Sequence, residues 1–149
     1  MIRILLILHL LFFAFSFAFT AGIGILQARI AKSGDARLIH RVFSIARPMS
    51  LAGGIGWIVT ALLGLMLAME ARMPLGQPWL VWSYLAFAVM ILTGFLFHKP
   101  FQEKVIAASA NGPSPELEVL LKSPVGPVGG IVSSLAVIAL VYLMTARLG

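Results

Sequence analysis

Residues 4–27 read ILLILHLLFFAFSFAFTAGIGILQ, and none of them is Lys, Arg, Asp or Glu. A bilayer core about 30 Å thick is crossed by about 20 apolar residues of helix, so this stretch can span a membrane. It is longer than the apolar region of a signal peptide, about 7–15 residues, and we therefore expect it to be retained. Three further charge-free stretches follow at residues 49–69, 78–97 and 125–145. The sequence predicts an all-α, polytopic membrane protein, with residues 1–149 forming a single bundle of four transmembrane helices.

The composition supports a membrane protein. Hydrophobic residues make up 60 % of the 149 positions and charged residues 11 %, against roughly 25 % charged residues in a soluble domain. Mean hydropathy is +1.03. The net charge of +6 is scattered between apolar runs, which favours contact with a lipid surface and not with nucleic acid. The chain has no Cys, so a metal would have to bind to His, Met or carboxylate ligands.

The positive-inside rule predicts the orientation. Eight of the 11 basic residues fall on one side of the four spans: Arg29, Lys32, Arg37, Arg41, Arg47, Lys99, Lys104 and Lys122. Three fall on the other side: Arg3, Arg72 and Arg147. We therefore expect the first and third loops to be cytoplasmic and both termini to be outside. Aromatic residues gather near the expected outer interface, at Trp79, Trp82 and Tyr84.

The two cytoplasmic loops are expected to contain helices. In the first, polar residues recur at helical spacing opposite an apolar face, at Arg37, His40, Arg41, Ser44 and Arg47. This pattern predicts a basic amphipathic helix that lies on the anionic leaflet or extends the second span into the cytosol. In the other loop, the turn-forming residues 111–115 predict two short helical pieces around a bend.

Small residues at four-residue spacing allow close helix packing in lipid. Such faces occur on the first and fourth spans, at Ala14, Ala18 and Gly22, and at Gly126, Gly130 and Ser134. A polar stripe runs along the opposite side of the first span, at His9, Ser16, Thr20 and Gln27. If the polar stripe faces the bundle interior, the Ala14 face is left for a second protein or another copy. A first helix sandwiched between two neighbours explains the pattern equally well.

Few residues are candidates for proton transfer or for binding a metal or haem. The five acidic residues lie at or beyond the membrane edges, so the spans contain no carboxylate pair for a proton relay. Among His, Lys, Arg, Asp and Glu, His9 is the one side chain inside a span. With Met66, Met69 and Met73, and with Met144 of the fourth span, it could offer ligands to Cu(I) or haem b. The alternative is that His9 hydrogen-bonds to a neighbouring helix and the methionines fill packing gaps.

Several short motifs carry a resemblance to known families. Between Thr20 and Val105 they are Gly22-Ile23-Gly24, Ser33-Gly34-Asp35, Gly53-Gly54, Gly64 and Gly76-Gln77-Pro78-Trp79-Leu80. In these the chain resembles an uncharacterised family of small bacterial four-helix integral membrane proteins, which implies an inner-membrane location. Leu8-His9-Leu10 is also similar to the first helix of the copper-resistance membrane domain and of haem-linked protoporphyrinogen oxidases. The glycine that those two families carry nine residues later is Ala18 here.

The sequence thus favours a non-catalytic accessory or assembly subunit that packs against other membrane subunits or self-associates, with no cofactor expected. A haem or copper protein that uses His9 is the main alternative. A small-solute transporter is the weaker one, since four spans without an internal repeat would need to form an oligomer to line a path.

Overall fold

The computed structural model describes residues 1–146, and its regular structure there is entirely helical. The elements are α1 (Ile2–Ala31), α2 (Ala36–Glu70), α3 (Pro78–Thr93), the π-helix η1 (Gly94–His98), α4 (Lys99–Ser109), α5 (Pro115–Lys122) and α6 (Val125–Ala146). Four helical stretches are long and apolar enough to cross a membrane. The expectation of an all-helical protein with four spans is confirmed. Arg147, which entered the charge count above, lies outside the described residues.

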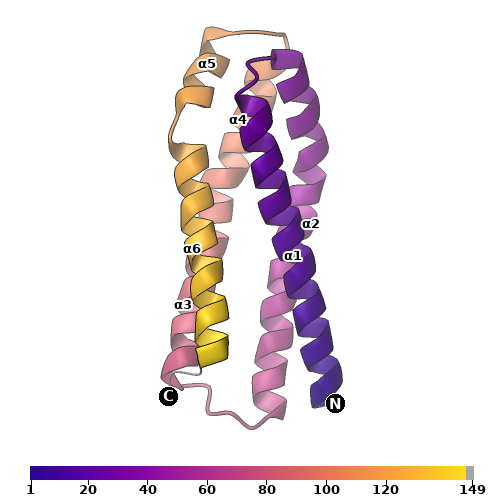
Figure 1. The fold of residues 1–149 in the computed structure, drawn as a ribbon, viewed down its shortest axis with the longest axis vertical. Helices are drawn as coiled ribbons and strands as arrows, with labels where there is room; N and C mark the ends of the chain where they lie inside the picture. Colours follow the sequence, from indigo (N-terminus) through magenta and orange to yellow (C-terminus); the bar gives the residue numbers. More distant parts are fainter. Residues whose placement is uncertain (147–149) are drawn as a thin grey trace.

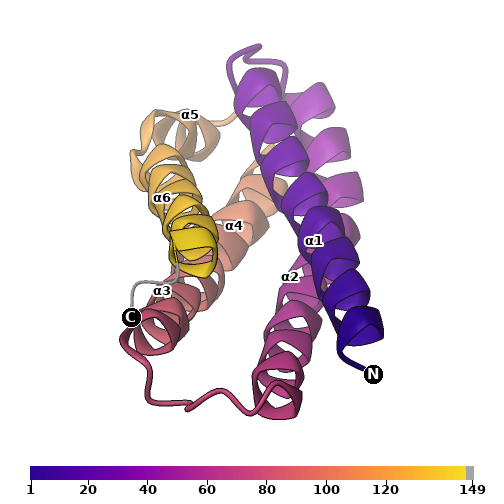
Figure 2. The same cartoon turned by 60° about the horizontal axis from the view of Figure 1, so that its bottom comes forward.

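The four long helices form two antiparallel pairs, α1 with α2 and α3 with α6 (Figures 1 and 2). The start of α1, the α2–α3 loop and the end of α6 all lie at one end of the bundle (Figure 1). In the centre the pairs meet through buried Trp57, Met90 and Ala136, against which Phe13 packs. The rings of Phe13 and Trp57 pack edge to face, with their centroids 5.4 Å apart. Such an arrangement suits the ring quadrupoles.

Helix α2 is longer than a membrane is thick. Its 35 residues correspond to about 52 Å at 1.5 Å per residue, about 20 Å more than the hydrocarbon core. The basic residues 37–47 therefore lie on a continuous extension of the second span, one of the two arrangements expected. Asp35 starts the helix, because its carboxylate accepts the N–H groups of Arg37 at 2.9 Å and Leu38 at 3.1 Å.

The extension of α2 packs with α4 and α5 into what we call the cap, formed by Ala36–Arg47, α4 and α5. Its core contains Ala36, Ile39, Phe43, Val105 and Leu117. Ile39 and Val105 are completely buried, with 0 % exposure. As expected, two short helical pieces, α4 and α5, flank a bend. Ser114 caps the start of α5, because its hydroxyl oxygen accepts the N–H of Leu117 at 3.1 Å.

The third span does not stop at the sequence His98-Lys99-Pro100. Helix α3 continues through η1 into α4 as one helical stretch from Pro78 to Ser109. The π-helix makes this possible, because the N–H of Lys99 bonds to the carbonyl of Gly94, five residues earlier. The wider turn contains one extra residue, and the helix continues although Pro100 has no backbone N–H to donate.

Three of the helical stretches that pass from the spans to the cap are interrupted near the base of the cap, whereas α1 is unbroken up to Ala31 and its Ile30 packs against the cap core. Helix α2 contains Pro48, α3 becomes α4 through η1, and α5 is separated from α6 at residues 123–124. Contacts across the bundle place Pro48 and residues 123–124 near the start of α4, just beyond η1. Arg47 pairs with Glu103 at 3.4 Å, and a Cβ at Gly126 would lie 3.1 Å from Phe101 Cε1.

Candidate functional site

His9 lies in the α1–α2 interface and is 7 % exposed. Its Nδ1 is 2.8 Å from the carbonyl oxygen of Thr60. A carbonyl only accepts, so Nδ1 carries the proton and donates it, which fixes the tautomer of a neutral ring. Among residues 1–146, Nε2 has no hydrogen-bond partner. The imidazole is therefore held at one nitrogen and unpartnered at the other.

Glycines of α2 create the space that α1 occupies. A Cβ at Gly64 would lie 2.9 Å from His9 Cε1, so the ring rests directly on this glycine. A Cβ at Gly53 would lie 3.1 Å from the Thr20 methyl group, and one at Gly56 would collide with the Ser16 hydroxyl. Small residues bring the two backbones together in this way without help from the hydrophobic effect.

The hydroxyl groups of this interface are satisfied within the helices. Ser16 Oγ donates to the Phe12 carbonyl at 2.6 Å, and Thr60 Oγ1 donates to the Gly56 carbonyl at 2.8 Å. Thr20 Oγ1 donates to the Ser16 carbonyl at 2.7 Å and accepts Trp57 Nε1–H at 3.4 Å. The Gln27 Nε2 atom is buried and unpartnered within the described residues. Most of the polar stripe thus serves packing of α1 against α2.

The methionines are placed away from His9. Met66 and Met69 are 53 % and 60 % exposed, and Met66 lies about 160° around α2 from Gly64, on which His9 rests. Met73 follows the end of α2, and Met144 is exposed on α6. The structure does not bring these thioethers together with His9. Within residues 1–146, no group of three or more His, Asp or Glu residues is placed to share a metal ion.

The small-residue faces differ between the two helices. Ala14, Ala18 and Gly22 are exposed, on the side of α1 opposite its contact with α2. A Cβ at Gly22 would meet nothing within 4 Å. On α6, Gly126 packs on Phe101, whereas Gly130 has open space and Ser134 is exposed.

The sequence reasoning missed the contact between α6 and His98. A Cβ at Gly129 would lie 3.2 Å from His98 Nε2, and Ser133 Oγ is 3.5 Å from the same nitrogen. The signal was present in Gly129 and Ser133, which repeat at four residues just as Gly130 and Ser134 do. The π-helix that ends at His98 is the feature that no spacing rule anticipated.

Within residues 1–146 the ionic contacts lie in the cap and at its base. Arg47 pairs with Glu103 at 3.4 Å, and Lys122 with Glu118 at 4.0 Å. All four side chains are largely exposed, so solvent screens both pairs and they contribute little to stability. The other basic side chains of the cap make no ion pair within the described residues.

The comparisons with known proteins agree with this architecture. No curated protein and no solved structure matches the chain. A family model described as a predicted integral membrane protein matches residues 3–148, nearly the whole chain. On that match, together with four helices that can cross a membrane, the chain is a member of the DUF2269 family of integral membrane proteins.

Proposed function

We propose that this protein is a non-catalytic accessory or assembly subunit of a bacterial inner membrane, which packs against other membrane helices or against a second copy. The observation that carries the proposal is the uncovered face of α1. Helix α1 packs along α2 and touches α6 only locally, so Ala14, Ala18 and Gly22 are left exposed. Small residues at this spacing let a further helix approach closely.

Substitution on this face tests the proposal. Gly22→Leu adds a side chain where the structure has open space, so the chain should still fold and insert while a partner helix is blocked. We expect the particle extracted in native nanodiscs to lose mass, as measured by mass photometry. Val141→Leu, an exposed position on α6, is the matched control and should leave the mass unchanged. An equal mass for wild type and Gly22→Leu would contradict the proposal.

The proposed location carries a test of orientation. Because the chain has no Cys, single cysteines can be placed at Ser33, Ser114 and Gly76. With the basic loops in the cytoplasm, the first two should react only with membrane-permeant maleimides in intact cells. Cysteine at Gly76 should react with impermeant reagents too. The reverse pattern would overturn the orientation.

A haem or Cu(I) protein is the second candidate, and the geometry of His9 favours it. Metal-bound histidines usually donate their other ring N–H to a carbonyl or carboxylate, which fixes the ring and leaves one nitrogen for the metal. His9 has this arrangement, with Nδ1 on the Thr60 carbonyl and Nε2 without a protein partner. Further ligands would come from a partner or a second copy, because Met66 and Met69 lie on another side of α2.

An absorption spectrum and elemental analysis of the purified protein separate the two candidates. A cofactor protein would show a Soret band or stoichiometric copper, lost in His9→Ala. An accessory subunit would be colourless and metal-free as purified. Its His9→Ala variant would keep its helix content and its particle mass.

A further inference from the structure

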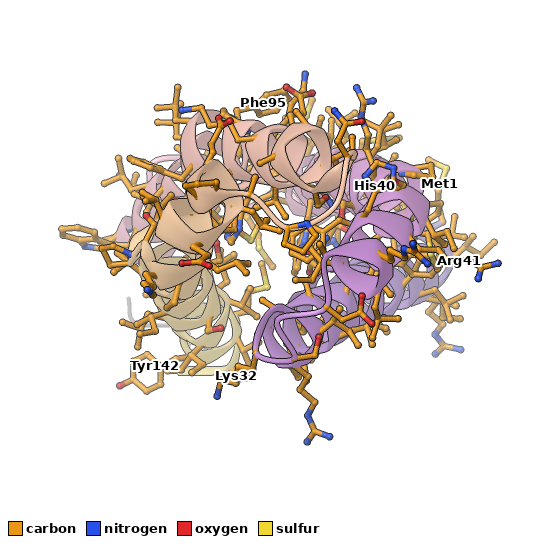
Figure 3. The ribbon with its side chains drawn as sticks, turned by 90° about the horizontal axis from the view of Figure 1, so that it is seen from above. Met1, Lys32, His40, Arg41, Phe95 and Tyr142 are labelled. Atoms are coloured by element: carbon orange, nitrogen blue, oxygen red, sulfur yellow. The ribbon has the colours of Figure 1, made fainter. Side chains whose placement is uncertain are left out.

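The free end of the cap carries an open depression of about 480 Å³ between α2 and the turn from α4 to α5. The first turns of α2 form one wall of the depression, and the end of α4 with the following turn forms the other. Figure 3 looks onto this end, where His40 lies between α2 and α4 while Arg41 points away from the bundle. The residues that line it include Arg37, His40, Ser109, Asn111, Gly112 and Pro113.

The lining is basic, and the Arg37 guanidinium and His40 Nε2 have no hydrogen-bond partner within residues 1–146. No Asp or Glu lines the depression, and Asp35 nearby turns its carboxylate to the N–H groups of α2. Arg37 forms no ion pair within the described residues. His40 Nδ1 lies 3.0 Å from the Ile106 carbonyl and must therefore carry a proton. Its Nε2 has no hydrogen-bond partner in the described chain, so this nitrogen is free to bond to a ligand.

The backbone that carries the lining residues of the depression packs against the cap core. Ile39, the neighbour of His40, and Val105, one turn before Ser109, are completely buried in the cap core. Ser109 Oγ donates to the Val105 carbonyl at 2.7 Å and so helps to close the end of α4. The backbone that carries His40 and Ser109 is therefore held in place by the cap core, whereas the exposed side chains of Arg37 and Asn111 must be ordered when a ligand binds.

We propose that this depression binds the phosphoryl group of a small soluble anion. Its three polar side chains, the Arg37 guanidinium, the His40 imidazole and the Asn111 carboxamide, come from two separate segments. A phosphoryl group offers three acceptor oxygens to such a set, whereas a carboxylate offers two. The proposal stands whether or not α1 packs against a partner.

The position of the site favours a soluble ligand over a lipid headgroup. Arg37 lies ten residues before Arg47, at the edge of the charge-free span, which is about 15 Å along the axis of α2. The headgroup layer on one side of a bilayer is only about 5–8 Å deep. Arg37 and His40 therefore stand beyond the phosphates of the membrane that holds the protein.

Titration with inorganic phosphate tests the site in the full-length protein, reconstituted in phosphatidylcholine nanodiscs and followed by ³¹P NMR. We expect saturable binding in the wild type. Arg37→Gln should weaken it about tenfold or more, since hydrogen bonds to charged groups contribute about 1.5–3 kcal/mol. His40→Gln should weaken it severalfold. Arg41→Gln removes an equal charge one turn away, outside the depression, and should change affinity less than about twofold.

Three results would overturn the proposal. These are the absence of saturable binding to the wild type, an equal loss in Arg41→Gln and Arg37→Gln, and full affinity in both depression variants while their circular dichroism is unchanged. A second set of nanodiscs that contain an anionic phospholipid distinguishes the source. A soluble ligand predicts that phosphate still binds there at moderate salt. A headgroup ligand predicts that the lipid occupies the site and abolishes phosphate binding, which would contradict the soluble source.

Discussion

The cap and the membrane-spanning part of the molecule are packed by opposite means. In the cap, large apolar side chains such as Ile39, Phe43 and Val105 fill the core. In the spans, the closest contacts between α1 and α2 are made by Gly53, Gly56 and Gly64. Water drives apolar side chains inward in the cap. In lipid that force is absent, and close packing of small residues holds helices together. One chain therefore follows two sets of packing rules.

The largest expected effect is in the cap core. Ile39→Ala should destabilise the protein by about 2–5 kcal/mol, because it removes buried methyl groups and leaves a cavity. Leu38→Ala, at an exposed neighbour, should cost less than about 1 kcal/mol. Thermal unfolding in nanodiscs, followed by circular dichroism, measures the difference. Equal stability of the two variants would show that the cap is not held by a water-driven core.

A glycine substitution tests the spans. Gly56→Ala should cost about 1–3 kcal/mol because the added methyl group collides with the Ser16 hydroxyl. Gly54→Ala meets nothing within 4 Å and should be neutral or stabilising by up to about 1 kcal/mol. The double variant Gly56→Ala/Ser16→Gly should recover part of the loss. Failure of that rescue would argue against direct contact as the cause.

The start of the cap helix gives a smaller effect. Asp35→Ala removes the carboxylate that accepts two N–H groups at the N-terminus of α2 and should cost about 1 kcal/mol. Asp35→Asn keeps an accepting oxygen and should retain most of the stability. Hydrogen exchange should report faster opening of residues 36–39 in the alanine variant, with no change in the spans. Loss of protection throughout α1 would contradict a local role.

The smallest effect is expected at His9. If the imidazole only packs, His9→Ala should cost about 0.6 kcal/mol and at most about 2 kcal/mol, the range measured for hydrogen bonds between membrane helices. Leu10→Ala, at an exposed lipid-facing position, is the control. Steric-trap unfolding in bicelles can resolve the difference. A much larger loss that is accompanied by loss of a bound cofactor would favour the haem or copper alternative.

The sequence was sufficient for the parts of the fold that depend on periodicity and charge. Apolar length predicts four spans, and the spacing of Arg37, His40 and Arg47 predicts a basic amphipathic helix, although only the structure shows that it extends α2. It was insufficient where two similar patterns compete. Gly129 and Gly130 begin equally plausible four-residue repeats, and only the crossing of α6 over α3 selects Gly129 to receive His98. Likewise, Pro100 predicts the end of a helix, but α3 continues past this position into α4 through the π-helix η1.

The interruptions at the base of the cap have a mechanical consequence. A helix resists bending through its ladder of backbone hydrogen bonds, and at Pro48, at η1 and at residues 123–124 that ladder is broken or widened. Helix α1, in contrast, is unbroken from Ile2 to Ala31, and its Ile30 packs against the cap core. Thermal bending should therefore concentrate at the three breaks, while α1 remains the stiffest connection between the cap and the spans. A lateral force applied to the cap would thus bend the other three helical stretches near its base, and α1 would limit the tilt.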